Sequence, residues 1–256
     1  MKRQPHRLSL ILRTWILLIF ISGHSNAYAQ NSEIDSLNAL IDVSRSDTSQ
    51  VDILNRLSYV ILNQDPEETI VYGLRAREMS ELIGYGIGKA YALKNIGLGY
   101  YYQGDYLKVL DYWTQSLNTF ENEQDTVGIS NMLNNLGAIY YTQGSNTKAI
   151  EYFLRSLRIA ERLGDTLRIA SALVNVGGLY SDNKKDYRKA LGYFWQVGEI
   201  SKLYPVDDQS MGGYLTGIGE VHKNMGNYDS ALFYLEKSLP LYKNTVLIPE
   251  ALIRLG

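Results

Sequence analysis

The sequence repeats itself with a period of about forty residues, and this period constrains the fold more than any other feature. Asn135-Leu136-Gly137 is followed by Tyr140-Tyr141, and related text begins at Asn95, at Asn175 and, less closely, at Ile218. A fixed period of this size is typical of stacked-repeat proteins, in which each unit buries its apolar face only against its neighbours. Such chains bind other molecules far more often than they transform them.

Apolar residues within each copy recur at helical spacing. Leu133, Leu136, Gly137 and Tyr140 fall three or four residues apart, which is one face of a helix and not the alternation of a strand. Gly137 and Ala149 are small enough to let two helices approach closely. The sequence therefore predicts an all-α, right-handed solenoid of antiparallel helix pairs, at residues 48–63 and 66–83, 87–103 and 106–122, 127–143 and 147–163, 167–182 and 187–203, and 208–225 and 228–243.

Capping residues mark the predicted helix ends. Asp47 and Asp125 each precede an apolar-periodic run, where a carboxylate can accept hydrogen bonds from the first backbone N–H groups. Glycine followed by a polar residue, as in Gly144-Ser145 and Gly226-Asn227, separates the two helices of a pair. We expect the polar residue of each such pair to cap the second helix.

The first 29 residues have the three parts of a secretory signal. A basic start is followed by an apolar stretch, Trp15 to Ile21, and by the small-x-small motif Ala27-Tyr28-Ala29. We expect cleavage after Ala29 and a periplasmic mature protein; an uncleaved N-terminal anchor is the alternative. The apolar stretch is shorter than the roughly 20 residues of a membrane helix.

Composition excludes several classes of protein. The chain has no cysteine, so it contains no disulfide and no lipid attachment at the cleavage site. All 27 acidic residues but only 21 of the 25 basic ones lie after Ala29, so the mature chain carries a net charge of −6. Nucleic-acid binding relies on clustered Lys and Arg, and the sequence disfavours it.

The expected domain organisation follows from these features. A leading helix at residues 30–46 comes between the signal peptide (1–29) and a repeat domain (47–256), with units at about 47–84, 85–124, 125–164, 165–206 and 207–246 and a partial unit at 247–256. The text stops inside this sixth unit, at Gly256. We therefore expect the sequence to be a fragment of a longer chain, because solenoids need a capped end.

The repeated residues resemble the tetratricopeptide repeat (TPR) family. Asn135-Leu136-Gly137, Tyr140-Tyr141, Gln143-Gly144, Ala149 and Tyr152-Phe153 are close to its consensus, and the likeness covers about residues 52–243. The period is longer than the usual ~34 residues of the family. The first unit departs most, with Ser58 where later units have Gly97 and Gly137.

This resemblance implies a superhelix whose concave groove, formed mainly by the first helix of each pair, holds a protein or peptide. The side chains expected in the groove are aromatic and amide groups in the second and third units, which suit a peptide. They are Tyr91, Lys94, Leu98 and Tyr101, then Asn131, Asn134, Ala138 and Tyr141; smaller or polar residues follow at Ser171, Val174, Gly178, Ser181, Thr216, Glu220 and Lys223.

Two further details concern polar residues of this face. Some family members grip a peptide's C-terminal carboxylate with lysine and asparagine, but Leu98, Ala138 and Gly178 replace the asparagines that such a clamp requires, so we do not expect it. The recurring Asn95, Asn135 and Asn175 could line the groove. We favour instead a structural role, hydrogen bonding to the backbone of adjacent helices, because a polar residue near a core must be paired.

Catalytic and metal sites are poorly supported. His222 is the only histidine after Ala29, so a Cys/His zinc site or multi-histidine cluster cannot form. His222 falls where other copies have Tyr140 and Tyr180, which predicts a packed or partly exposed position. Asp207-Asp208 lacks the spaced ligands of a calcium loop and is expected to cap a helix. We predict no metal, no cofactor and no catalytic residue in this chain.

The sequence thus predicts an exported, non-catalytic module that binds a protein or peptide as a scaffold or sensor. The alternative, favoured by the abrupt end, is the N-terminal extracytoplasmic region of a longer signalling enzyme of the histidine kinase or nucleotide cyclase type. The partner and the oligomeric state are not encoded in any pattern that we recognise.

Overall fold

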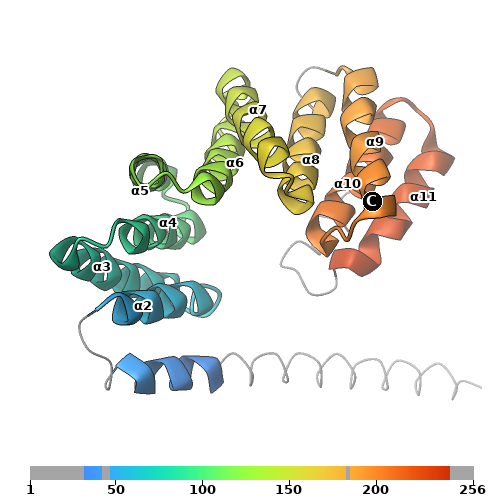
Figure 1. Ribbon diagram of the computed structural model, residues 1–256. Coiled ribbons are helices and arrows are strands. Elements are labelled where there is room, and N and C mark those ends of the chain that lie inside the picture. The colour runs from blue at the N-terminus through green and yellow to red at the C-terminus, as the bar shows by residue number, and fades with distance from the viewer. Residues whose placement is uncertain (1–31, 42–46, 183–184, 243–256) are drawn as a thin grey trace, which may run out of the picture. The chain divides into compact units, whose positions relative to one another are not determined.

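The computed structural model describes residues 32–41, 47–182 and 185–242. The predicted signal peptide and the partial sixth unit lie outside these ranges. All regular structure in the described residues is helical, as Figure 1 shows, and the predicted all-α solenoid of helix pairs is confirmed. None of the helices in these ranges has the combination of length and apolarity that a membrane crossing requires.

The helices follow the predicted order, in pairs joined by short turns. Their bounds are α2 (Thr48–Val60) and α3 (Pro66–Ile83), α4 (Gly86–Tyr102) and α5 (Tyr106–Asn122), α6 (Thr126–Thr142) and α7 (Asn146–Leu163), α8 (Thr166–Asp182) and α9 (Tyr187–Leu203), and α10 (Asp208–Asn224) and α11 (Tyr228–Ser238). The predicted end of the last helix, residue 243, was wrong. Because Pro240 cannot donate a helical hydrogen bond, α11 ends at Ser238 and a 3-10 turn, η1 (Leu239–Tyr242), follows.

The chain divides into two compact units, residues 1–112 and 113–256, with the division inside α5. In the first unit, α2, α3 and α4 pack around the fully buried Leu54, Ala76 and Ala92. A helix at residues 32–41, within the predicted leading segment, contributes Ile41 to the same core. The divergent Ser58 is buried, and its hydroxyl donates to the backbone oxygen of Thr69 at 2.8 Å, so this small residue still allows α2 and α3 to pack closely.

In the second unit, a glycine and a phenylalanine fit together across the α6–α7 pair and across the α8–α9 pair. A Cβ atom added to Gly137 would lie 2.6 Å from the buried Phe153 ring, and one added to Gly177 would lie 2.7 Å from Phe194. Contacts this short do not occur between real atoms, so α6 and α8 can pack against these rings only because they carry glycine there. The close approach predicted for Gly137 is therefore present.

Stacked tyrosines recur near the turn that joins the two helices of a pair, and a lysine lies over each of these stacks. Tyr140 stacks on Tyr152 with ring centroids 5.3 Å apart, and Lys148 Nζ lies 5.0 Å from the Tyr140 ring. The same arrangement joins Tyr180, Tyr193 and Lys189 in the second unit and Tyr100, Tyr112 and Lys108 around α4 and α5. These six tyrosines thus serve packing between the helices of a pair.

Most of the predicted caps are present. The Asp47 and Asp125 carboxylates each accept from two backbone N–H groups at the start of α2 and α6. Ser145 and Asn227 make no side-chain cap, which corrects the prediction for the starts of α7 and α11. Gly164 ends α7 with φ +64°, a left-handed conformation that favours glycine.

Candidate functional site

The first unit contains a pocket of about 350 Å³ between the first helices of two successive pairs, α2 and α4. Its size is at the lower end of the range for ligand pockets. Its walls combine aromatic, amide and charged side chains. The lining residues are Asp52, Asn55, Arg56 and Tyr59 from α2 and Tyr91, Lys94 and Asn95 from α4.

Lys94 lines this pocket and lies close to two of its aromatic rings. Its Nζ is 5.7 Å from the centroid of the Tyr59 ring and 5.6 Å from that of Tyr91. Such cation–π contacts stabilise an ammonium group that has lost part of its water. Burial nevertheless lowers the pKa of Lys94 from its ordinary value, because the charged form is less well solvated than in water.

Two asparagines connect α2 to α4 behind the lysine. Asn95 Nδ2 donates to the backbone oxygen of Asn55 at 2.9 Å, and Asn55 Nδ2 donates to the backbone oxygen of Gly88 at 2.9 Å. The structural role predicted for Asn95 is therefore confirmed. The Oδ1 atom of Asn55 is buried and has no hydrogen-bond partner. A buried acceptor without a donor is costly to the folded state.

The remaining charges of the pocket belong to α2. Arg56 forms an ion pair of 2.7 Å with Glu33 on the helix at residues 32–41. Asp52 accepts a hydrogen bond from the Tyr85 hydroxyl at 3.2 Å. Both pairs are exposed, so they orient the side chains more than they stabilise the fold.

The structure divides the groove residues predicted in the second repeat into two groups. Tyr91 and Lys94 line the pocket, whereas Leu98 is half-buried outside it. Tyr101 is 41% exposed and makes edge contacts with the Tyr102 and Tyr106 rings. The sequence analysis missed the α2 side of the pocket, because no groove residues were predicted for the divergent first repeat. The first repeat is offset from the second by 39 residues, as Ser58 and Gly97 show. The same offset from Tyr91, Lys94 and Leu98 leads to Asp52, Asn55 and Tyr59.

Three of the groove residues predicted in the third repeat are hydrogen-bonded to the fourth repeat. Asn131 Oδ1 accepts from Arg168 Nε at 3.0 Å, and Asn134 Oδ1 accepts from Asn175 Nδ2 at 2.8 Å. The Tyr141 hydroxyl donates to the Asp182 carboxylate. These bonds connect α6 to α8, so all three side chains contribute to the joint between successive repeats.

Two later residues that were expected on the groove surface are buried. Ser181 on α8 and Thr216 on α10 are each less than a tenth exposed, so the prediction for them was wrong. Their small side chains are covered by the residues packed around them, so little of either one reaches the surface. Gly178, by contrast, faces open space.

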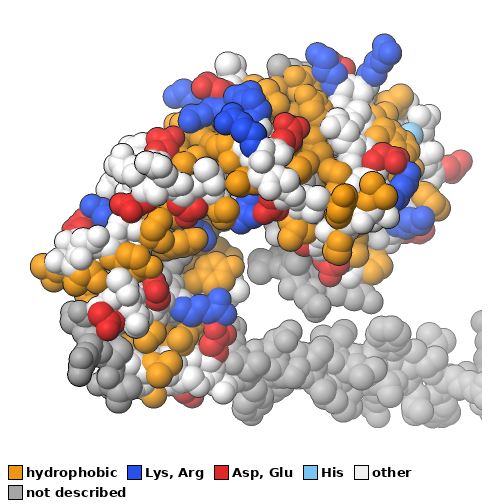
Figure 2. Space-filling view, in the orientation of Figure 1, with side chains coloured by type: hydrophobic (Ala, Val, Ile, Leu, Met, Phe, Trp, Pro, Cys, Tyr) orange, Lys and Arg blue, Asp and Glu red, His pale blue; other side chains and the backbone are white. Residues whose placement is uncertain are grey.

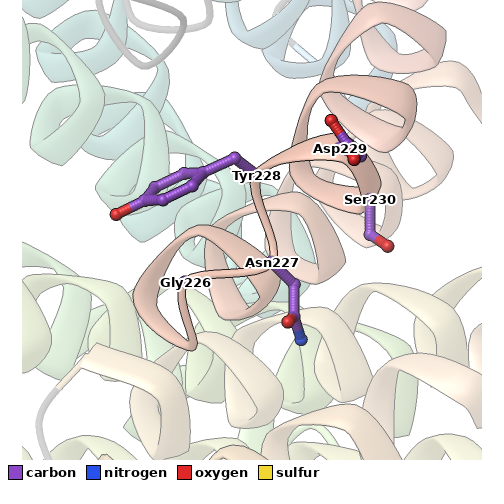
Figure 3. A pocket seen from close by; sticks show the side chains of 5 residues that line it. All are labelled: Gly226, Asn227, Tyr228, Asp229 and Ser230. Atoms are coloured by element: carbon purple, nitrogen blue, oxygen red, sulfur yellow. The ribbon is translucent and has the colours of Figure 1, made fainter.

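A second hollow lies at the turn before α11, lined by Gly226, Asn227, Tyr228, Asp229 and Ser230. Figure 3 shows that their side chains point in different directions, with the Tyr228 ring turned away from the polar groups. Tyr228 is 71% exposed. Because these groups do not converge on one point, this turn is a weaker candidate than the pocket between α2 and α4.

His222 is partly exposed, as expected, and stacks on Tyr234 with ring centroids 5.8 Å apart. It thus replaces the first tyrosine of the stacks found in other pairs. Asp207 accepts from the backbone N–H and the hydroxyl of Ser210, both at 2.8 Å, which confirms a helix cap. No group of three or more metal-ligating side chains is found within the described ranges.

Surface charge does not single out another site. On the face drawn in Figure 2, Lys and Arg side chains lie among Asp and Glu side chains. A mixed surface of this kind gives little long-range steering. Recognition on this face then depends on local contacts.

Comparison with known sequences identifies the repeats. Two models of the tetratricopeptide repeat match, one over residues 128–201 and one over residues 213–245. This chain is a tetratricopeptide repeat protein. No curated protein matches the TPR chain by sequence.

Solved structures show the same fold. The TPR chain is similar to BtubC from P. vanneervenii, at 16% identity over 83% of this chain and 91% of that one, with a TM-score of 0.70. It is also similar to NprR in complex with its cognate peptide NprX, at 19% identity over 96% and 69%, with a TM-score of 0.67. A third similar structure is aspartyl phosphate phosphatase F from Bacillus subtilis, at 18% identity with a TM-score of 0.62. The match covers 81% of this chain but only 57% of that one.

Proposed function

We propose that this TPR chain is an exported, non-catalytic module that binds a peptide or a peptide segment of a protein, and that recognition centres on the pocket between α2 and α4. The observation that carries the proposal is the meeting of two tyrosine rings, an ammonium group and two amide side chains in one pocket. Rings supply contact area to a peptide, and amides pair with its backbone.

The similarity to NprR supports a peptide as the ligand class. That protein was solved in complex with a cognate peptide, and it shares the fold over most of this chain. A protein scaffold such as this one recognises extended or helical segments with side chains of successive first helices. The pocket is formed by two such helices, α2 and α4.

Export is the second part of the proposal and rests on the pattern of residues 1–29. In a bacterial host we expect the protein in the periplasmic fraction, with Gln30 as the first residue by N-terminal sequencing. Replacing both Ala27 and Ala29 with Leu should leave an uncleaved precursor, because the peptidase requires small residues at these positions. Full-length protein confined to the cytoplasm would exclude export.

Peptide binding can be tested without knowing the natural partner. Purified protein is used to select from phage-displayed random decapeptides, and the affinities of the enriched peptides are measured by calorimetry. Replacing Tyr59 and Tyr91 together with Ala should weaken binding about tenfold or more, because interface aromatics contribute much of the energy. The melting temperature should change little, since Tyr59 is exposed and Tyr91 only half-buried.

Tyr228→Ala provides the matched control, because it removes a ring that lines the other hollow. We expect it to leave peptide affinity unchanged. A loss of binding in this variant and not in the Tyr59/Tyr91 variant would move the site to the turn before α11. Failure of the protein to enrich any peptide would exclude the proposed function.

A further inference from the structure

The two positive charges of the pocket between α2 and α4 are already engaged within the protein. Arg56 forms an ion pair of 2.7 Å with Glu33. The Lys94 ammonium is held near two rings, with Nζ 5.7 Å from the centroid of Tyr59 and 5.6 Å from that of Tyr91. A ligand that used either cation would have to compete with these contacts.

The acidic side chain of the pocket, Asp52, is in a different situation. It is an exposed residue whose Oδ1 accepts a hydrogen bond of 3.2 Å from the Tyr85 hydroxyl. None of the ion pairs between described residues includes it. An ionised carboxylate can accept about four hydrogen bonds, so most of the capacity of Asp52 is within reach of a ligand.

Tyr85 and Gly88 fix the position of this carboxylate. A Cβ atom added to Gly88 would lie 2.4 Å from the Tyr85 ring, so the ring lies against the first turn of α4 where a side chain is missing. From there its hydroxyl reaches Asp52. Burial, and then the charge of Asp52, raise the pKa of Tyr85, so the hydroxyl keeps its proton. A positioned carboxylate loses less entropy when it pairs with a ligand.

A carboxylate beside aromatic rings suits a basic side chain. An ammonium or guanidinium group forms charge-assisted hydrogen bonds with a carboxylate, and it is attracted to the faces of rings such as Tyr59 and Tyr91, which line the same pocket. Residues 30–256 carry a net charge of −6, which attracts cations and repels anions over longer distances. Local and overall charge therefore favour the same kind of ligand.

Lys94 limits how much positive charge the ligand can carry. Its ammonium lies near Tyr59, which is seven residues from Asp52 and so about 10 Å further along α2. Salt screens most of the repulsion between exposed charges at such a separation, so a cation at Asp52 is tolerated. A second basic residue that reached Tyr59 would meet the ammonium directly. The pocket thus favours one basic residue over a basic run.

We propose that the pocket between α2 and α4 receives a single Lys or Arg side chain of a bound peptide, with its cation paired to the Asp52 carboxylate. This inference rests on the proposed peptide-binding function and names its ligand class. Tyr85 is a positioning residue in this arrangement, since it acts on the ligand only through Asp52.

The test uses the decapeptides enriched by selection and measures their affinities by calorimetry. Replacing the basic residue with a neutral analogue, citrulline for Arg or acetyl-lysine for Lys, removes the charge and keeps most of the shape. This change should weaken binding to the wild-type protein about fivefold, because a charge pair that the peptide partly shields is stronger than an exposed one. Salt at about 0.5 M should reduce the difference.

Asp52→Asn should bind the charged and neutral peptides equally. Its amide oxygen can still accept from the Tyr85 hydroxyl, so the fold should be kept, and the melting temperature verifies this. Asp111→Asn is the matched control, because Asp111 is an exposed acid on α5 outside the pocket and the change in net charge is the same. The full difference between the peptides should remain in this variant.

Tyr85→Phe tests the positioning role without changing Asp52. The preference for the charged peptide should fall to a value between those of the wild type and Asp52→Asn, because the carboxylate loses the donor that orients it. Affinity for the neutral peptide should stay the same. Equal weakening of both peptides would show that Tyr85 acts only through packing and would remove it from the inference.

Three results separate this inference from the proposed function. Enriched peptides without a basic residue, or with an acidic residue in its place, would overturn the inference and leave peptide binding intact. A preference for the charged peptide that persists in Asp52→Asn, or that is lost equally in Asp111→Asn, would also overturn it. Absence of any enriched peptide would sink the proposed function itself.

Discussion

Two equivalent pairs of asparagines, one in each compact unit, are hydrogen-bonded differently. Asn55 and Asn134 occupy the repeat position of Lys94, and Asn95 and Asn175 follow that position in the next repeat. Asn95 bonds the backbone oxygen of Asn55, whereas Asn175 bonds the side-chain oxygen of Asn134. The amide oxygen is therefore vacant in the first unit and paired in the second.

This difference separates a contact made entirely within the protein from the pocket that we propose as a binding site. Between α6 and α8, the bond from Asn175 to Asn134 is accompanied by those from Arg168 to Asn131 and from Tyr141 to Asp182. Between α2 and α4, the side-chain oxygen of Asn55 is buried without a partner, and two rings and a lysine line the same pocket as Asn55. Both units thus use asparagines to connect successive repeats, and they differ in whether the side-chain oxygen of the first asparagine is bonded.

The largest expected effect tests whether the packing beneath the second-unit surface is as tight as the geometry indicates. Gly137→Leu should lower the free energy of unfolding by roughly 1–3 kcal/mol, because even its Cβ would overlap the Phe153 ring. Gly178→Leu is the control, since a Cβ there meets open space. Urea unfolding of both variants measures the difference. Equal stability of the two would show that Phe153 can move aside.

The next effect concerns the paired amide of the second unit. Asn134→Ala should cost about 1 kcal/mol of stability, because the half-buried Asn175 Nδ2 loses its acceptor. The same variant should bind selected peptides like the wild type. If it weakened peptide binding and left stability unchanged, Asn134 would belong to the binding surface and the contrast between the units would fail.

Tyr141 provides a smaller test of the same contrast. Tyr141→Phe removes only the hydroxyl that donates to Asp182, and we expect a loss of about 0.5 kcal/mol because the bond is partly exposed. A double-mutant cycle with Asp182→Ala isolates the pair. A coupling energy of zero, together with weaker peptide binding by Tyr141→Phe, would assign this ring to recognition.

The smallest effect is a pH dependence in the first unit. Burial lowers the folded-state pKa of Lys94, so between that value and its ordinary value near ~10.4 the unfolded state binds more protons. The wild type should therefore gain stability relative to Lys94→Met as the pH rises through this alkaline window. Melting temperatures of both proteins from neutral pH to pH 10.5 measure the change; a constant difference would show that Lys94 is as well solvated as a free lysine.

Much of the fold could be predicted because helical periodicity and caps are local signals. Asp47, Asp125 and the recurrent glycines placed most helix ends within a few residues, and Pro240 accounts for the largest error. The close helix approach at Gly137 was predictable from its missing side chain, and the structure adds that the Phe153 ring occupies that space.

The site was only half predictable, for two physical reasons. The α2 side of the pocket lies in a divergent unit, and Asn55 can be placed there only once the 39-residue spacing to Lys94 is used. The partners of Asn131, Asn134 and Tyr141 depend on side-chain rotamers across two helices, which periodicity does not encode. Repeat position alone cannot distinguish a bonded amide from an open one.

The helix at residues 32–41 has a consequence for how many molecules associate. Ile41 covers Leu54, Ala76 and Ala92, while Glu33 pairs with Arg56 and Asn38 accepts a hydrogen bond of 3.4 Å from the Tyr72 hydroxyl. Without this cover, the exposed side of α2 and α3 would offer the kind of surface on which another repeat stacks, and head-to-tail contacts of that type build open filaments. We therefore expect that removal of residues 32–41 appears as concentration-dependent assembly rather than as unfolding.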